Sequence, residues 1–169
     1  RAHVVLPYHC EMDGYIEELK GDNKVGTTKN GIGPCYADRD NRIGIRVCDF
    51  IDKEEFAKRL KENLELKNME IVKLYGKVAD TDTADMDYES MLKEYEGYAD
   101  RLRPYVCDTI ALLHDELKAD RKILFEGAQA TMLDIDYGTY PYVTASHPIS
   151  GGIGVGAGVA PRDIDKVVG

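Results

Sequence analysis

Apolar residues recur at helical spacing through the middle of the chain. Phe56, Leu60 and Leu64 stand four residues apart behind Asp52, a residue type that caps helix N-termini. The pattern therefore predicts a long amphipathic helix that begins after Asp52 and continues toward Leu74.

The flanking segments predict further elements. A second helix up to Pro104 is predicted from Met91, Tyr95, Tyr98 and Leu102, and a third, capped by Asp108, from Ile110, Leu113 and Leu117. A charged helical stretch covers 11–20, and the acidic segment 78–87, which lacks periodicity, predicts a solvated connection. We treat 52–120 as a helical insertion within a single domain fragment, 1–169.

Two glycine-rich regions flank this insertion. The short apolar run Lys122–Phe125 predicts a strand that ends at a ligand crevice, and the glycines over 151–158 predict a loop that feeds a helix opened by Pro161. The simplest packing brings both ends of the chain to one side of a sheet. We therefore expect an α/β fold, a mainly parallel sheet with flanking helices.

Composition excludes several classes of protein. The net charge of −9, with Lys and Arg interspersed among acids, argues against nucleic-acid binding, and no apolar run approaches a membrane span. The 4 cysteines form no CxxC pair, so neither a zinc site nor a redox motif is expected. Because the sequence begins at Arg1 inside an apolar run, we expect an internal segment of a longer polypeptide.

The loop 26–34 offers hydroxyls and unhindered backbone N–H groups, which suit a phosphate. It is not a Walker loop, because Ile32 and Gly33 stand where Lys and Ser or Thr are required. Taken alone, the motif favours an ordinary glycine-rich turn that ends at Pro34 over a phosphate site. Asp134 and Asp136 leave structural hydrogen bonding and acid–base work both open.

Four long motifs nevertheless occur together in order: GTTKNGIGP, RIGIRVCDF, LFEGAQATMLDIDYGTYPYVT and GGIGVGAGVAPR. In this order and spacing they resemble the adenylosuccinate synthetase family. The resemblance implies a P-loop NTPase-like fold and a cytoplasmic homodimer. It also implies a ligase that joins IMP and L-aspartate using GTP, with Mg²⁺ on the GTP and the magnesium ligands outside this chain.

The resemblance also assigns roles to residues. It implies that Thr28 and Thr144 bind the 5′-phosphate of IMP, that Arg42 reaches the IMP phosphate of the other subunit, and that Gln129 contacts the purine near its 6-position. It implies no catalytic residue and no metal ligand within these 169 residues, since the family's GTP loop, catalytic aspartate and catalytic histidine are not among them. The fragment alone is therefore expected to be inactive.

Three positions depart from the family pattern. Ile43 replaces a basic residue, Ala130 replaces glycine, and His147 stands where asparagine is usual, which could add pH dependence. Two alternatives remain open at this point: a non-catalytic module that binds purine monophosphates, and a structural or dimerisation segment whose glycines serve packing.

Overall fold

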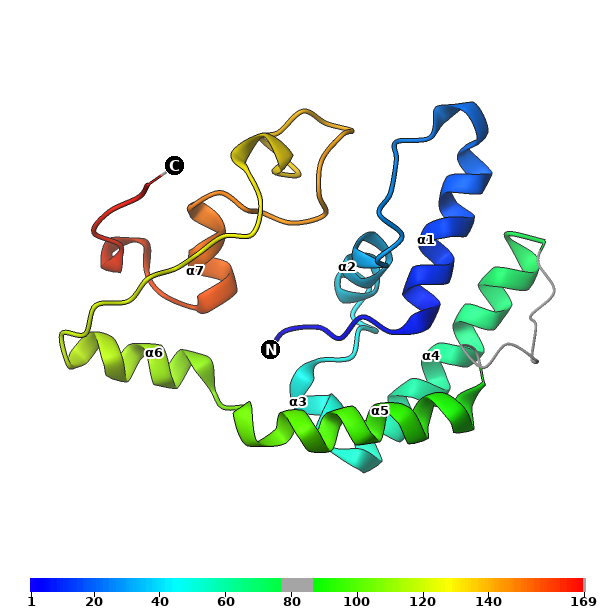
Figure 1. Ribbon diagram of the computed structural model, residues 1–169, viewed down its shortest axis with the longest axis horizontal. Coiled ribbons are helices and arrows are strands. Elements are labelled where there is room, and N and C mark those ends of the chain that lie inside the picture. Colours follow the sequence, from blue (N-terminus) through cyan, green and yellow to red (C-terminus); the bar gives the residue numbers. More distant parts are fainter. Residues whose placement is uncertain (77–86, 169) are drawn as a thin grey trace. The chain divides into compact units, whose positions relative to one another are not determined.

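The computed structural model describes residues 1–76 and 87–168, which belong to two compact units, Arg1–Val106 and Cys107–Gly169. Figure 1 shows the helices of each unit. The predicted acidic connection over 78–87 lies almost entirely outside the described residues. None of the helices in the two described ranges combines the length and the apolar character that a bilayer crossing requires.

The first unit is built from helices. They are α1 (Pro7–Lys20), α2 (Ile32–Asp40), α3 (Val47–Phe50), α4 (Lys53–Lys73) and α5 (Tyr88–Leu102). Helix α1 packs on α2 and α4, and α4 packs on α3 and α5 (Figure 1). Their shared core consists of Leu6, Tyr8, Ile45, Phe50, Phe56, Leu60, Leu64, Met91 and Ala99. Burial of this apolar surface is the main force that holds the helices together.

Side-chain caps begin two of the helices where the sequence predicts them. The Asp52 carboxylate accepts the Glu55 N–H at 3.1 Å, and α4 runs on to Lys73. Asp108 accepts the N–H groups of Ile110 and Ala111 at 3.0 and 3.3 Å. The second predicted apolar face is correct only in part, because Tyr98 and Leu102 of α5 are exposed.

The second unit contains α6 (Thr109–Lys118) and α7 (Gly151–Ala157), joined by a long irregular segment with a 3₁₀ turn at Thr131–Leu133. The two helices pack on each other near the end of α7. There Gly158 lies against Ile110, and the His114 Nε2 is 3.1 Å from the Gly158 carbonyl oxygen. Val159, which follows, is buried.

The predicted α/β fold with a mainly parallel sheet is wrong. Among the described residues there is no strand, and the β-pairing present is one isolated antiparallel bridge between His3 and Arg46. The run Lys122–Phe125 is irregular, and Leu124 is 88% exposed. A strand forms only where a neighbour accepts and donates its backbone hydrogen bonds. No segment in the described ranges pairs with this run, so its apolar pattern alone does not make a sheet.

Two helices lie where loops were predicted. Helix α2 begins at Ile32, and Pro34 occupies its first turn, where a missing N–H costs nothing. Helix α7 forms despite its glycines; a Cβ at Gly152 would lie 2.1 Å from the His147 carbonyl oxygen, so this close approach requires glycine. The helix expected at Pro161 is only a three-residue 3₁₀ turn, Pro161–Asp163. The treatment of 52–120 as an insertion stays a prediction.

Candidate functional site

The glycine-rich loop 26–31 is attached to α1 by two carboxylates. Asp13 Oδ2 accepts the Thr27 hydroxyl at 2.7 Å and the Gly31 N–H at 3.1 Å, while Glu17 Oε2 accepts the Gly26 N–H at 3.0 Å. The Lys29 N–H donates to Thr27 Oγ1 at 3.0 Å. Within the described residues the Thr28 side chain takes no part in this network, and it is exposed.

The backbone of this loop turns sharply, with positive φ at Gly26 (89°), Lys29 (56°) and Gly31 (71°). Gly31 also presses against α1, since a Cβ there would lie 2.7 Å from the Cβ of His9 and 2.8 Å from the Cys10 nitrogen. Both the conformation and the contact require glycine at this position. The sequence places the loop correctly, and the contacts with α1 define its shape.

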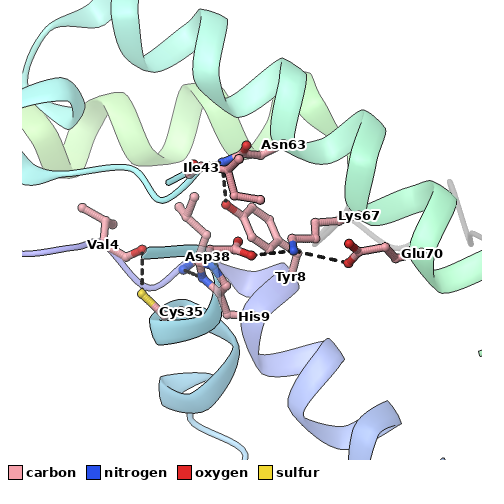
Figure 2. Close-up of polar contacts among 10 residues, drawn as sticks. Val4, Tyr8, His9, Cys35, Asp38, Ile43, Asn63, Lys67 and Glu70 are labelled. Atoms are coloured by element: carbon pink, nitrogen blue, oxygen red, sulfur yellow. Dashed lines mark hydrogen bonds and ion pairs between the residues drawn. The ribbon is translucent and has the colours of Figure 1, made fainter. Parts of the chain in front are cut away.

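A network of charged side chains lies buried beside the loop (Figure 2). Asp38 of α2 accepts from Lys67 Nζ of α4 through Oδ1 at 2.6 Å and from His9 Nε2 of α1 through Oδ2 at 3.0 Å. Lys67 also lies 3.3 Å from Glu70 Oε2. Asp38 is 1% exposed and Lys67 4%. These bonds tie α1, α2 and α4 together through one carboxylate.

The hydrogen bonds of His9 determine which nitrogen of its ring carries the proton. The Leu6 N–H donates to Nδ1 at 2.9 Å, so a neutral ring carries its proton on Nε2, where it donates to Asp38. Burial alone would raise the pKa of the Asp38 carboxyl, but the hydrogen bonds from His9 and Lys67 outweigh it and hold that pKa below its usual value. Asp38 is therefore a carboxylate that pairs with buried Lys67.

The end of α2 places Arg42 in an unusual backbone conformation. The Ile43 N–H donates to the Asp38 carbonyl at 3.0 Å, and the Arg42 N–H donates to the Arg39 carbonyl at 3.0 Å. This pair of bonds is a Schellman motif, whose left-handed position is usually glycine. Here Arg42 occupies it with φ of 63°. An L-residue in this region is strained, and such strain tends to occur at functional sites.

Arg42 lines a basic pocket of about 250 Å³. The pocket is lined by His3, Arg39, Arg42, Gly44, Arg46, Cys48, Asp49 and Arg59. Arg59 pairs with Glu55 at 2.6 Å, whereas neither Arg42 nor Arg46 forms an ion pair within the described ranges. Burial, with Arg46 and Arg39 nearby, lowers the pKa of His3. Guanidinium groups gathered in this way suit an anion such as a phosphate.

Gln129 and Thr144 lie in the second unit. Gln129 is exposed in a bend after the irregular run 121–127. Thr144 is half-buried, and its N–H donates to the Leu133 carbonyl at 2.9 Å. Among the residues that the structure describes, neither side chain has a hydrogen-bond partner.

Asp134 holds the segment between them in place. It is fully buried and accepts the N–H groups of Asp136 and Tyr137 through Oδ1, at 3.0 and 3.1 Å. His147 Nδ1 lies 3.2 Å from Asp134 Oδ2. Burial acts to raise the pKa of Asp134, yet these backbone and histidine hydrogen bonds lower it overall. The structure thus favours structural hydrogen bonding over acid–base work for this carboxylate, and it places His147 against it.

The predicted site residues are divided between the units. Thr28 and Arg42 belong to the first and Gln129 and Thr144 to the second, and the roles of all four stay predictions. Sequence reasoning missed the buried pair Asp38 and Lys67. A signal exists for Lys67, which continues the apolar stripe of α4 at helical spacing between Leu64 and Ile71. A lysine on that face needs a buried partner.

A metal site is not present in the described part of the chain, where no group of three or more His, Cys, Asp or Glu side chains is arranged to hold an ion.

Comparison with known proteins gives a consistent result. The family model for adenylosuccinate synthetase matches residues 1–169. The chain is 55% identical to adenylosuccinate synthetase of Brachyspira hyodysenteriae and 52% identical to that of Clostridioides difficile, each over 169 residues. The matched region covers 100% of this chain but only 38% of the length of each of these relatives. The structure of fully ligated adenylosuccinate synthetase from Plasmodium falciparum is similar with a TM-score of 0.84 and 36% identity, covering 97% of this chain and 37% of that one.

Proposed function

Because the chain belongs to the adenylosuccinate synthetase family, we propose that it forms the IMP-binding part of a ligase that joins IMP and L-aspartate at the expense of GTP. The observation that carries the proposal is the family match over all 169 residues. The strained backbone of Arg42 beside a cationic pocket supports it from the structure.

In this reaction the γ-phosphoryl group of GTP is transferred to the 6-oxygen of IMP. The aspartate amino group then attacks C6, and phosphate leaves with the former 6-oxygen. Phosphorylation turns a poor leaving group into a good one, so the protein contributes chiefly positioning and charge stabilisation. We assign Gln129 to the purine near the 6-position, where its amide can both donate and accept.

The far end of the nucleotide is anchored by hydroxyls and a guanidinium. Thr28 and Thr144 donate to the 5′-phosphate, and Arg42 reaches the phosphate bound to the second subunit of a homodimer. The Thr28 side chain is exposed and outside the network that holds its loop, which leaves its hydroxyl available. Arg42 lies among other guanidinium groups whose field favours an anion.

Mg²⁺ would act with GTP, and its ligands are expected outside these residues, which offer no metal cluster in the described ranges. No step above depends on it. We further propose that the enzyme acts in the cytoplasm, and that the 169 residues alone do not form adenylosuccinate. A GTP- and aspartate-dependent yield of adenylosuccinate from these residues alone would overturn that last proposal.

The test is a calorimetric titration of the folded chain with IMP, beside Thr28→Ala and Gln129→Ala variants. An exposed threonine at the start of α6 supplies the matched control, Thr109→Ala. Saturable binding that both site variants lose and the control keeps supports the proposal. Equal binding by all four proteins, or none by a full-length synthetase that carries this sequence, contradicts it.

A further inference from the structure

The loop that carries Thr28 is held from behind by acidic side chains. We propose that Asp13 and Glu17 of α1 are positioning residues, a carboxylate clamp that fixes loop 26–31 so that the Thr28 hydroxyl faces the phosphate. This inference rests on the proposed function, because it assigns the clamp a role in that same phosphate site.

The clamp engages the loop at both ends. Asp13 Oδ2 accepts the Thr27 hydroxyl at 2.7 Å and the Gly31 N–H at 3.1 Å, so one oxygen atom closes a five-residue turn. Glu17 Oε2 holds the Gly26 N–H at 3.0 Å, where the loop begins. Hydrogen bonds to a charged acceptor are about twice as strong as neutral ones. The loop conformation therefore depends on these two carboxylates.

Helix geometry explains why one helix can do this. Asp13 and Glu17 are four residues apart, and His9 is four residues before Asp13, so all three share a face of α1. Gly31 packs against His9, which Asp38 fixes in turn. The loop is thus pressed onto a helix face that the buried network of the first unit already orients.

The same bonds decide which donors remain for a ligand. The Gly26 N–H, the Thr27 hydroxyl and the Gly31 N–H point to the carboxylates. A phosphate cannot bind these donors beside Asp13 and Glu17, because the two carboxylates would repel its negative charge. Lys20 offsets only Glu17, at 2.9 Å, and with the Gly26 N–H it lowers the pKa of that carboxyl. The anion must therefore use donors that the carboxylates leave unengaged, such as the hydroxyl of exposed Thr28.

Loss of the clamp should weaken phosphate binding because the loop would spend less time in the conformation that binds phosphate. If the loop holds its competent conformation for only a fraction of the time, the apparent Kd rises by the reciprocal of that fraction. Removing one or two charge-assisted bonds, such as those of Asp13, corresponds to an effect of about 10- to 100-fold. The contact with the purine, made elsewhere, should not change.

The experiment uses a full-length synthetase that carries this sequence, with Asp13→Ala and Thr27→Val as test variants. Thr27→Val keeps the side-chain shape and leaves α1 unchanged; it removes the hydroxyl that donates to Asp13 and accepts the Lys29 N–H. Glu11→Ala is the matched control, an exposed acid on the same helix. The readouts are the KM for IMP, kcat, and calorimetric affinity for IMP and for inosine, which lacks the phosphate.

We expect both test variants to raise the KM and Kd for IMP about 10- to 100-fold, with inosine affinity and kcat little changed and Glu11→Ala equal to the parent. A purely structural role would lower thermal stability and weaken IMP and inosine alike, which overturns the inference. If Thr28→Ala loses IMP while both test variants keep it, the clamp is wrong and the proposed function stands. If the parent shows no preference for IMP over inosine, both are wrong.

Discussion

Replacement of Arg42 by glycine should stabilise the protein and impair its function at the same time. Arg42 occupies the left-handed position of the Schellman motif that ends α2, with φ of 63°. An L-residue in this region costs about 1–2 kcal/mol. Glycine removes that cost but adds about 0.5–1 kcal/mol of chain entropy in the unfolded state. The net gain is about 0.5–1 kcal/mol, or a rise in Tm of about 1–4 °C for a chain of this size.

The assay is thermal unfolding followed by circular dichroism, with two comparison variants. Arg42→Ala removes the guanidinium but keeps the strained conformation, so it should give no rise in Tm. Asp120→Gly is a positive control, because Asp120 follows α6 in the same motif with φ of 55° and lies outside the proposed IMP site. Its gain should be smaller, since aspartate tolerates the left-handed region better than arginine does.

Function should respond in the opposite direction. In the full-length enzyme, Arg42→Gly and Arg42→Ala should both weaken IMP binding about 10- to 100-fold, the range for loss of a bond to a charged group. Asp120→Gly should bind IMP normally. The reasoning is refuted if Arg42→Gly is no more stable than Arg42→Ala, or if its IMP affinity equals that of the parent.

Three further predictions concern stability. Asp38→Asn should cost about 3–5 kcal/mol in urea unfolding because it leaves Lys67 buried without its charge partner, and adding Lys67→Met should recover much of that loss; a strictly additive double variant would contradict the pairing. The lowered pKa of Asp134 contributes stability above its unfolded pKa of about 3.9, and that stability is lost as pH falls through the folded pKa. Acid unfolding of Asp134→Asn should therefore depend less steeply on pH below about 4, and an unchanged slope would argue against it. Gly152→Ala should lower Tm, since its Cβ would lie 2.1 Å from a backbone oxygen of His147; an unaltered Tm would show that α7 can shift at no cost.

Local rules in the sequence anticipated the helices that have clear caps. Asp52 and Asp108 cap α4 and α6 through their carboxylates, and the stripe of Phe56 and Leu60 is fully buried. These features depend only on residues within a few positions of one another. They could therefore be read from the chain alone.

Features that depend on distant contacts were not anticipated. The run Lys122–Phe125 has the composition of a strand, but a strand is defined by a neighbour that the pattern does not reveal. Helix α7 forms from a glycine-rich segment because its glycines allow close approach to the backbone at His147. In both cases the tertiary environment, rather than local propensity, decides the structure.

In the candidate site, too, local features could be predicted from the sequence and contacts between distant residues could not. The loop carrying Thr28 could be located from its glycines and threonines, yet its attachment to Asp13 crosses from one element to another. The pairing of Lys67 with Asp38 spans 29 residues, so only the anomalous lysine on an apolar face gave a hint of it. The strain at Arg42 follows from the way α2 ends, and the sequence analysis predicts no helix there.

A crystal structure of the full-length enzyme with IMP would test the central claim most directly. We expect a phosphate oxygen within hydrogen-bond distance of the Thr28 and Thr144 hydroxyls, Arg42 of the second copy on the same phosphate, and Thr27 still donating to Asp13. A phosphate bound away from both threonines, in a protein that is active in the same buffer, would contradict the account.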